Sequence, residues 1–226
     1  MAWEIVTWSL RLLWRHLGLF LLANVLWLVL TLCVVTWPAA TGGLFYLVEM
    51  VVREEWDNGP QDAKLSDFWV GFKQFGLRST ALALMDLAII VLIAGSFWFY
   101  SHQSWEPLRW LVGPISVVGV AWAGAQLYLF PLMIRRPSHG LASWLRESLL
   151  ITVSYPANTC SLLLVALVLA FAALILAGPF LLIFFSILAL LQTIALRFVL
   201  IQRGEVAPIR SPKAQATRPS NRRFPK

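Results

Sequence analysis

Long runs of apolar residues dominate the chain, and short polar stretches separate them. Five runs reach or approach the roughly 20 residues with which a helix crosses a ~30 Å hydrocarbon layer, and a sixth is shorter. They cover residues 17–36, 79–100, 108–134, 159–177 and 180–201, with the shorter run at 37–52. Helices are the expected structure, because lipid cannot satisfy open backbone groups and no ten-residue alternating strands occur. The sequence therefore predicts an all-α, polytopic transmembrane helix bundle over residues 1–202, with about six spans.

The composition supports a membrane protein over a soluble one. Of the 226 residues, 59% are hydrophobic and only 13% are charged, whereas a soluble domain carries about twice that share of charge. The mean hydropathy is +0.75.

The basic residues give the predicted orientation. Of the 18 Lys and Arg residues, 16 fall in the N-terminus, the loops and the tail that six spans place on one side. Only Arg109 falls in a loop on the opposite side, and Arg197 lies inside the last span. Because basic loops stay in the cytoplasm, we expect a multi-pass protein of the inner (plasma) membrane with both termini cytoplasmic.

A five-span alternative stays open. The run 37–52 has 16 residues and measures about 24 Å as a helix, which is short for a full crossing. If it re-enters the membrane, the N-terminus lies outside and the basic residues divide 14 against 3. Charge alone favours six spans only modestly.

Six spans form three helical hairpins that turn near residues 36–38, 101–107 and 178–179. An amphipathic segment precedes the first, third and fifth spans, and we expect each to form a short interfacial helix. The three apolar faces consist of Val6, Leu10, Leu13, Trp14 and Leu17; of Leu65, Phe68, Trp69, Phe72 and Phe75; and of Leu141, Trp144, Leu145 and Leu149. Anchoring in the membrane explains these faces, and a docking surface for a partner is the alternative.

The C-terminal tail, residues 203–226, contains four prolines and seven basic residues against one acid. Such a segment cannot bury a core, so we expect a disordered cytoplasmic tail. Its basic residues favour binding to anionic lipid at the bilayer surface. No nucleic-acid-binding module is recognisable, and nucleic acid is not a predicted partner.

Six polar residues interrupt the predicted spans, and the topology places all of them in the cytoplasmic half of the membrane. They are Asn24, Glu49, Asp86, Gln126, Gln192 and Arg197. The outer halves hold little beyond Thr31, Cys33 and Ser186. An ionised group within a membrane is costly and usually pairs. We therefore expect Asp86 to pair with Arg197 and take Glu49 as the competing partner.

This candidate polar cluster has two interpretations. As interhelical contacts, such groups are worth about 0.6–2 kcal/mol each. Alternatively, they line a water-filled vestibule that opens to the cytoplasm and holds a ligand or contacts a partner.

The sequence offers no chemistry for catalysis. No hydrolase, nucleotide-binding or paired metal motif occurs, and neither cysteine has a second ligand at metal-binding spacing. We expect that the protein is not an enzyme and that it uses no cofactor or metal.

Several short apolar motifs resemble a known family. They are Asn24-Val25-Leu26-Trp27-Leu28, Val34-Val35-Thr36, Pro38-Ala39-Ala40-Thr41 with Leu44 and Tyr46, Phe68-Trp69-Val70-Gly71-Phe72-Lys73, and Phe130-Pro131-Leu132. Together they resemble the signature of the YesL-like family, bacterial integral membrane proteins assigned to a domain of unknown function. The resemblance covers about residues 8–201, with Trp37 and the basic tail as departures.

The resemblance implies a role but no mechanism. YesL-like proteins are often encoded beside sugar-uptake transporters, which implies an accessory part in carbohydrate uptake, and the family supplies no catalytic residues. Our leading hypothesis is a non-enzymatic protein that binds a membrane transporter complex through its cytoplasmic-side surface. The alternative is a small transporter or channel that uses the Asp86, Glu49 and Arg197 groups.

Overall fold

The computed structural model describes residues 2–57, 62–176 and 181–206, and within these ranges the chain forms helices and no strand. The helices are α1 (Ala2–Arg15), α2 (Leu17–Thr31), the short 3-10 helix η1 (Val34–Thr36), α3 (Trp37–Asp57), α4 (Leu65–Ser101), α5 (Glu106–Arg109), α6 (Val112–Arg135), α7 (Leu141–Ser154), α8 (Pro156–Leu176) and α9 (Leu181–Gln202). The predicted all-α class is confirmed. Five helical stretches of the described chain are long and apolar enough to cross a membrane, so this is a membrane protein.

The first predicted span forms a shorter helix than expected, and the second forms a longer one. Helix α2 has only 15 residues, about 22 Å, and ends five residues before the predicted span does. Helix α3 has 21 residues, because it continues past Val52 to Asp57. The segment that looked too short to cross is therefore long enough, and α2 reaches a comparable length only together with α1, to which it is joined by a 91° bend.

Helix α4 joins two segments that the sequence separated. It is continuous over 37 residues, about 55 Å, and contains both the third predicted span and the amphipathic segment before it. No proline interrupts it, and Asp67 Oδ2 accepts the Lys64 backbone N–H at 2.9 Å to close its first turn. The expectation of a separate interfacial helix is wrong here: Phe68 and Phe75 are buried against the rest of the protein.

Helix α3 packs closely on the first part of α4, and glycines allow the approach. A Cβ on Gly71 would lie 2.4 Å from Tyr46 Cβ, and one on Gly43 would lie 2.8 Å from the Phe68 carbonyl oxygen. Further along, a Cβ on Gly76 would lie 3.3 Å from Ala39 Cβ. Residue numbers rise on one helix as they fall on the other, so the two helices are antiparallel.

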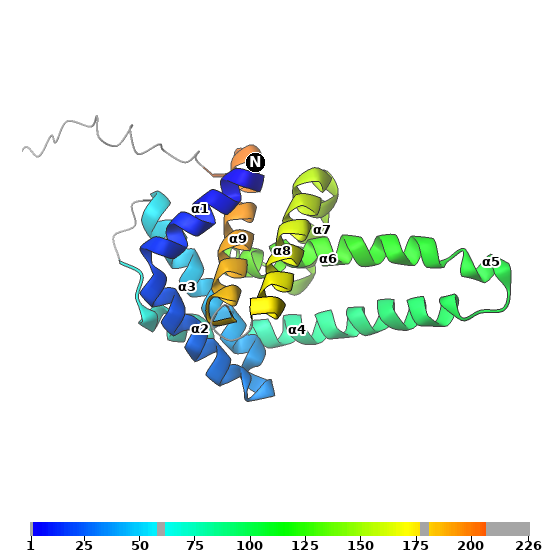
Figure 1. Cartoon of the computed structure of the whole chain (residues 1–226), viewed down its shortest axis with the longest axis horizontal. Helices are drawn as coiled ribbons and strands as arrows, with labels where there is room; N and C mark the ends of the chain where they lie inside the picture. Colours follow the sequence, from blue (N-terminus) through cyan, green and yellow to red (C-terminus); the bar gives the residue numbers. More distant parts are fainter. Residues whose placement is uncertain (1, 58–61, 177–180, 207–226) are drawn as a thin grey trace, which may run out of the picture.

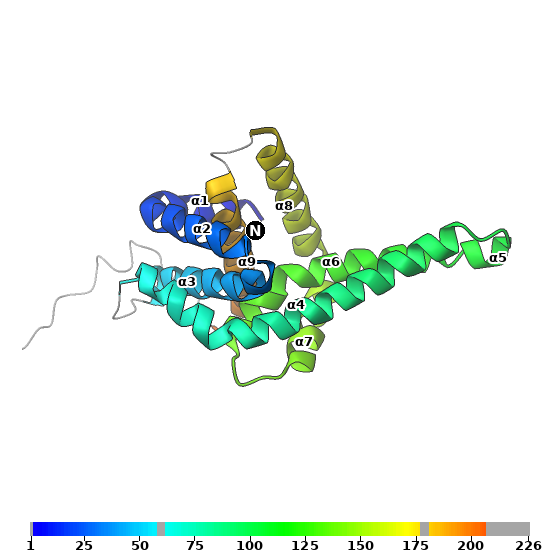
Figure 2. The ribbon, with the colours of Figure 1, turned by 90° about the horizontal axis from the view of Figure 1, so that it is seen from below.

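This register sets the turn between α2 and α3 beside the middle of α4, near Gly76 and Ser79. Beyond Ser79, α4 continues for about 33 Å at 1.5 Å per residue before it reaches its own turn. The turns of the first two hairpins therefore lie at different levels. Figures 1 and 2 show the result: α4 and α6 extend side by side away from the other helices, with α5 at the far end. We call residues 80–126 the projecting hairpin and the remaining packed helices the body.

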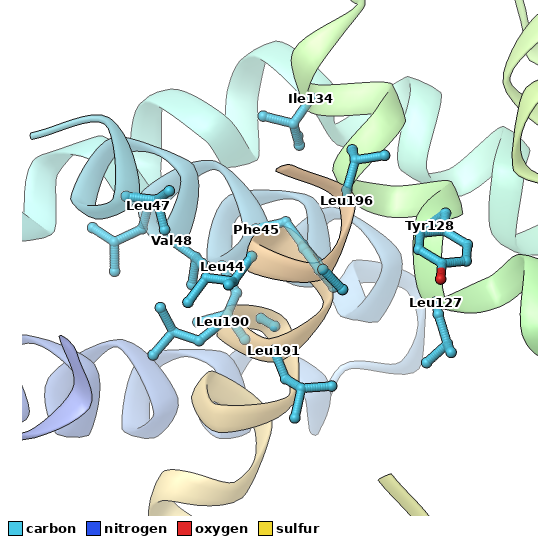
Figure 3. Close-up of a cluster of buried hydrophobic side chains, with 14 of the residues drawn as sticks. Leu44, Phe45, Leu47, Val48, Leu127, Tyr128, Ile134, Leu190, Leu191 and Leu196 are labelled. Atoms are coloured by element: carbon cyan, nitrogen blue, oxygen red, sulfur yellow. The ribbon is translucent and has the colours of Figure 1, made fainter. Parts of the chain in front are cut away.

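The hydrophobic core lies in the body, where α3, α6 and α9 meet. Figure 3 shows Leu44 and Val48 of α3 facing Leu190 and Leu191 of α9. In α9, 72% of the apolar stretch is buried, whereas only 6% of that in α4 is buried. Apolar surface on the projecting hairpin is thus left for lipid or a partner.

The other two amphipathic segments are separate helices, α1 and α7. Helix α1 packs on α9 through Ile5, Ser9 and Leu12. Of the predicted apolar face, Leu10 and Trp14 are exposed instead, which leaves an outward aromatic stripe suited to the membrane interface. Helix α7 packs on α6 and buries Trp144 of its predicted apolar face within the protein.

The predicted tail falls almost entirely outside the described residues, because the description ends at residue 206. The third predicted turn, at 178–179, also lies outside them.

Candidate functional site

The described contacts divide the six predicted polar residues among separate sites. Asp86 and Gln126 lie together on the projecting hairpin. Glu49 joins α3 to α6, and Asn24 joins α2 to α9. The other two, Gln192 and Arg197, are buried on α9. Four of the six predicted residues are buried and Asp86 and Gln126 are partly buried, but the sequence did not foresee which of them meet.

Asp86 is held by two side chains of α6. Trp122 Nε1–H donates to Asp86 Oδ1 at 2.9 Å, and Gln126 Nε2 donates to the same oxygen. The predicted pair between Asp86 and Arg197 is wrong: neither donor to Asp86 comes from α9. The sequence analysis also missed Trp122, although it stands four residues before Gln126 on the same helical face.

Arg197 lies in an aromatic part of the body. Its guanidinium carbon is 4.9 Å from the centre of the Trp56 ring, which is a cation–π distance. Trp56 in turn meets Trp8 edge to face, with ring centres 5.5 Å apart. Arg197 is 2% exposed, so this site lies inside the packed body.

Glu49 forms a buried ion-pair site with two arginines. Oε1 accepts N–H groups from Arg135 and from Arg53, each at 2.9 Å. Glu49 is 1% exposed. These two arginines, and not Arg197, are its described partners, so Glu49 is not the competing partner that the sequence suggested.

Asn24 contacts Ser186, which the sequence analysis placed in the outer half of the membrane. Asn24 Nδ2 donates to Ser186 Oγ at 2.6 Å. The two residues therefore share one level, and the prediction that they lie in opposite halves of the membrane is wrong.

A groove runs along the projecting hairpin toward the Asp86 side of its base. Its volume is about 510 Å³. The walls come from residues spaced three and four apart on each helix, so that one stripe of α4 faces one stripe of α6. They include Ile90, Ile93, Phe97, Gly119, Trp122 and Gln126. The last two are the donors to Asp86, so the carboxylate lies next to the inner end of an apolar groove.

The groove and the polar group beside it have the character of a binding site. Within residues 2–57, 62–176 and 181–206, no group of three or more His, Cys, Asp or Glu side chains is placed to hold a metal ion. The groove offers a carboxylate, an aromatic ring and apolar walls. Such a lining suits a ligand with one cationic group and an apolar body.

Comparison with known proteins identifies one family. The model of a family described as "Protein of unknown function, DUF624" matches residues 20–97, about a third of the chain. The matched part contains most of α2, all of α3 and most of α4, and it includes Asn24, Glu49 and Asp86. No curated protein and no solved structure matches. The chain is therefore similar to a family of unknown function, and its role must be argued from its own residues.

Proposed function

We propose that this protein is a non-enzymatic accessory protein that binds a partner membrane protein through the side of its projecting hairpin. The observation that carries the proposal is the place of Asp86. It lies on a two-helix hairpin that extends outward from the body, and its hydrogen-bond donors come from the hairpin itself.

Lipid can cover most of this hairpin, but it solvates a carboxylate poorly. Leu84 and Leu87 beside Asp86 are exposed apolar groups that acyl chains solvate well. An Asp at mid-membrane costs about 2.5–3.5 kcal/mol on insertion scales, and less toward the faces. Asp86 is only partly buried by α4 and α6. A partner that covers this side would remove the remaining cost.

The resemblance to the YesL-like family supports a finer proposal. On that basis the partner is a carbohydrate-uptake transporter in the bacterial inner membrane. The distribution of Lys and Arg supports cytoplasmic termini. We place the partner-binding surface on the hairpin and not, as the sequence suggested, on the cytoplasmic side. The amphipathic first part of α4, which could have formed that cytoplasmic-side surface, packs on α3 instead.

A small transporter or channel is the less favoured alternative. Such a function needs polar groups that line a common path, and Asp86, Glu49 and Asn24 each have a different set of partners. Reconstituted protein that moves a solute across liposomes, with a flux that Asp86→Asn changes, would favour this alternative.

Site-specific photo-crosslinking in the native membrane tests the proposal. A photoreactive residue replaces Leu87 on α4, which is 58% exposed, or the control Leu22 on α2, which is 55% exposed. We expect a discrete protein adduct from position 87 and lipid adducts from position 22. Mass spectrometry of the adduct then identifies the partner.

The identity of the adduct tests partner binding and the link to carbohydrate uptake separately. A transporter subunit in the adduct supports the link to carbohydrate uptake, whereas another membrane protein retains partner binding and removes that link. Lipid adducts alone at position 87 would contradict the accessory function itself.

A further inference from the structure

The groove on the projecting hairpin has the dimensions of a helix-binding site. Its α6 wall extends from Ile115 to Gln126, which is about 16 Å, or three helical turns. Two antiparallel helices form its sides, and exposed apolar residues flank it along the lipid-facing surface.

Small residues allow another backbone to approach the groove closely. Ala94 of α4 and the pair Gly119 and Ala123 of α6 line it. The spacing of Gly119 and Ala123 is the small-xxx-small pattern through which transmembrane helices pack. A Cβ on Gly119 would meet only Ile93 Cγ2, at 3.5 Å. The groove is thus shallow and apolar, as helix packing requires.

A cation would complement the carboxylate of Asp86 next to the inner end of the groove. Both described donors use Asp86 Oδ1, and no other described residue donates to the carboxylate. An ionised carboxylate only accepts hydrogen bonds. In a low-dielectric setting the group that best satisfies the second oxygen is a Lys or Arg side chain, because it supplies both a donor and the opposite charge.

We propose that the groove binds a transmembrane helix of the partner that carries one Lys or Arg, and that this cation pairs with Asp86 Oδ2. The inference rests on the proposed accessory function and adds the docking site and the chemistry of the partner. A helix fits better than a small cationic ligand, because Gly119 and Ala123 offer a surface for helix packing. The groove also has few polar groups that could orient a small molecule.

The test uses the full chain in liposomes and synthetic transmembrane helices as probes. Energy transfer is measured between the labelled protein and a labelled 22-residue Leu/Ala peptide, a length that spans a bilayer. One peptide carries a single Lys about 15 residues from its outer end, which matches the distance of Asp86 from Ser101 along α4. The second peptide has Leu at that position. We expect the Lys peptide to associate about tenfold more tightly, a difference of about 1.4 kcal/mol.

Two pairs of variants separate charge from fold. Asp86→Asn keeps an acceptor for Trp122 and Gln126 and removes the charge, so the preference for Lys should disappear. Glu106→Gln on α5 removes an exposed acid at the opposite end of the hairpin from Asp86 and should leave the preference intact. Gly119→Leu fills the groove and should abolish binding of the Lys peptide, whereas Gly113→Leu on the same helix enters open space and should not.

Three results would overturn the inference. One is equal association of the Lys and Leu peptides, and another is a Lys preference that survives Asp86→Asn. The third is binding of an alkyltrimethylammonium amphiphile that depends on Asp86 when neither peptide binds, which would indicate a small-ligand site. A protein adduct at position 87 that persists in Asp86→Asn would retain the accessory function while contradicting this docking site.

Discussion

Arg135 of α6 donates through Nε to Oε1 of Glu49 on α3 at 2.9 Å, inside the packed body. Glu49 also accepts from Arg53, one turn further along its own helix. Its side chain is 2% exposed and that of Arg135 11%. The pair joins two core helices through charge where the surrounding contacts are apolar.

Removing the charge of Glu49 should therefore be costly. Glu49→Gln leaves Arg135 buried without its counter-charge, and we expect a loss of about 3 kcal/mol in the free energy of unfolding. The measurement is reversible unfolding in mixed detergent micelles. Glu55→Gln is the control: its partner Arg15 is 64% exposed, so the loss should stay below about 1 kcal/mol. Equal effects of the two variants would show that the Glu49 pair is not buried in the membrane-embedded protein.

Two glycines of α4 should respond oppositely to the same substitution. Gly71→Ala places a Cβ 2.4 Å from Tyr46 Cβ, and overpacking of this kind costs about 1–3 kcal/mol. Gly95→Ala meets no atom within 4 Å and should stabilise the helix by up to about 1 kcal/mol. The same unfolding assay compares them. A tolerated Gly71→Ala would mean that α3 does not approach α4 here.

The offset between α3 and α4 can be tested with disulfides. In a background without Cys33 and Cys160, the pair Ala39→Cys and Gly76→Cys should crosslink, because their Cβ atoms lie 3.3 Å apart before adjustment. If the turns of both hairpins lay level, Ala39 would instead face the region of Trp98. The control pair Ala39→Cys and Trp98→Cys should remain reduced under the same oxidant. A crosslink in the control alone would refute the register described above.

Asn24 and Ser186 should be energetically coupled. Their side chains share a 2.6 Å hydrogen bond between α2 and α9, and contacts of this kind are worth about 0.6–2 kcal/mol in membrane proteins. A double-mutant cycle with Asn24→Ala and Ser186→Ala, followed by unfolding, should give a coupling of about 1 kcal/mol. Strictly additive losses would place the two residues apart.

The sequence predicts the helices well where hydrophobicity alone decides them. The last predicted span, 180–201, agrees with α9 to within one residue at each end, because apolar residues dominate this helix along its whole length. The end of α3 could not be found in this way. Arg53, Glu54 and Glu55 end the apolar run, yet the backbone stays helical because these side chains reach partners at the edge of the body.

The candidate site was predictable by residue but not by partner. Counting along each span gives the depth of a polar residue only if all spans begin at a common level, and α2 and α3 do not share the level of α4. Asp86 and Arg197 therefore appeared to match in depth while lying on elements that do not meet at these residues. Nor does the sequence give the direction of a side chain around its helix, and that direction selects Trp122 and Gln126 for Asp86.

The unbroken course of α4 ties the bilayer to the shape of the whole molecule. About 55 Å of continuous helix exceeds a hydrocarbon layer of about 30 Å, and such an excess is accommodated by tilting or by local thickening of the lipid. The first turns of α4 pack closely against α3 at Gly43 and Gly71. We therefore expect a tilt of the hairpin to move the body with it. A change in membrane thickness around the hairpin should thus alter the tilt of the body in the bilayer.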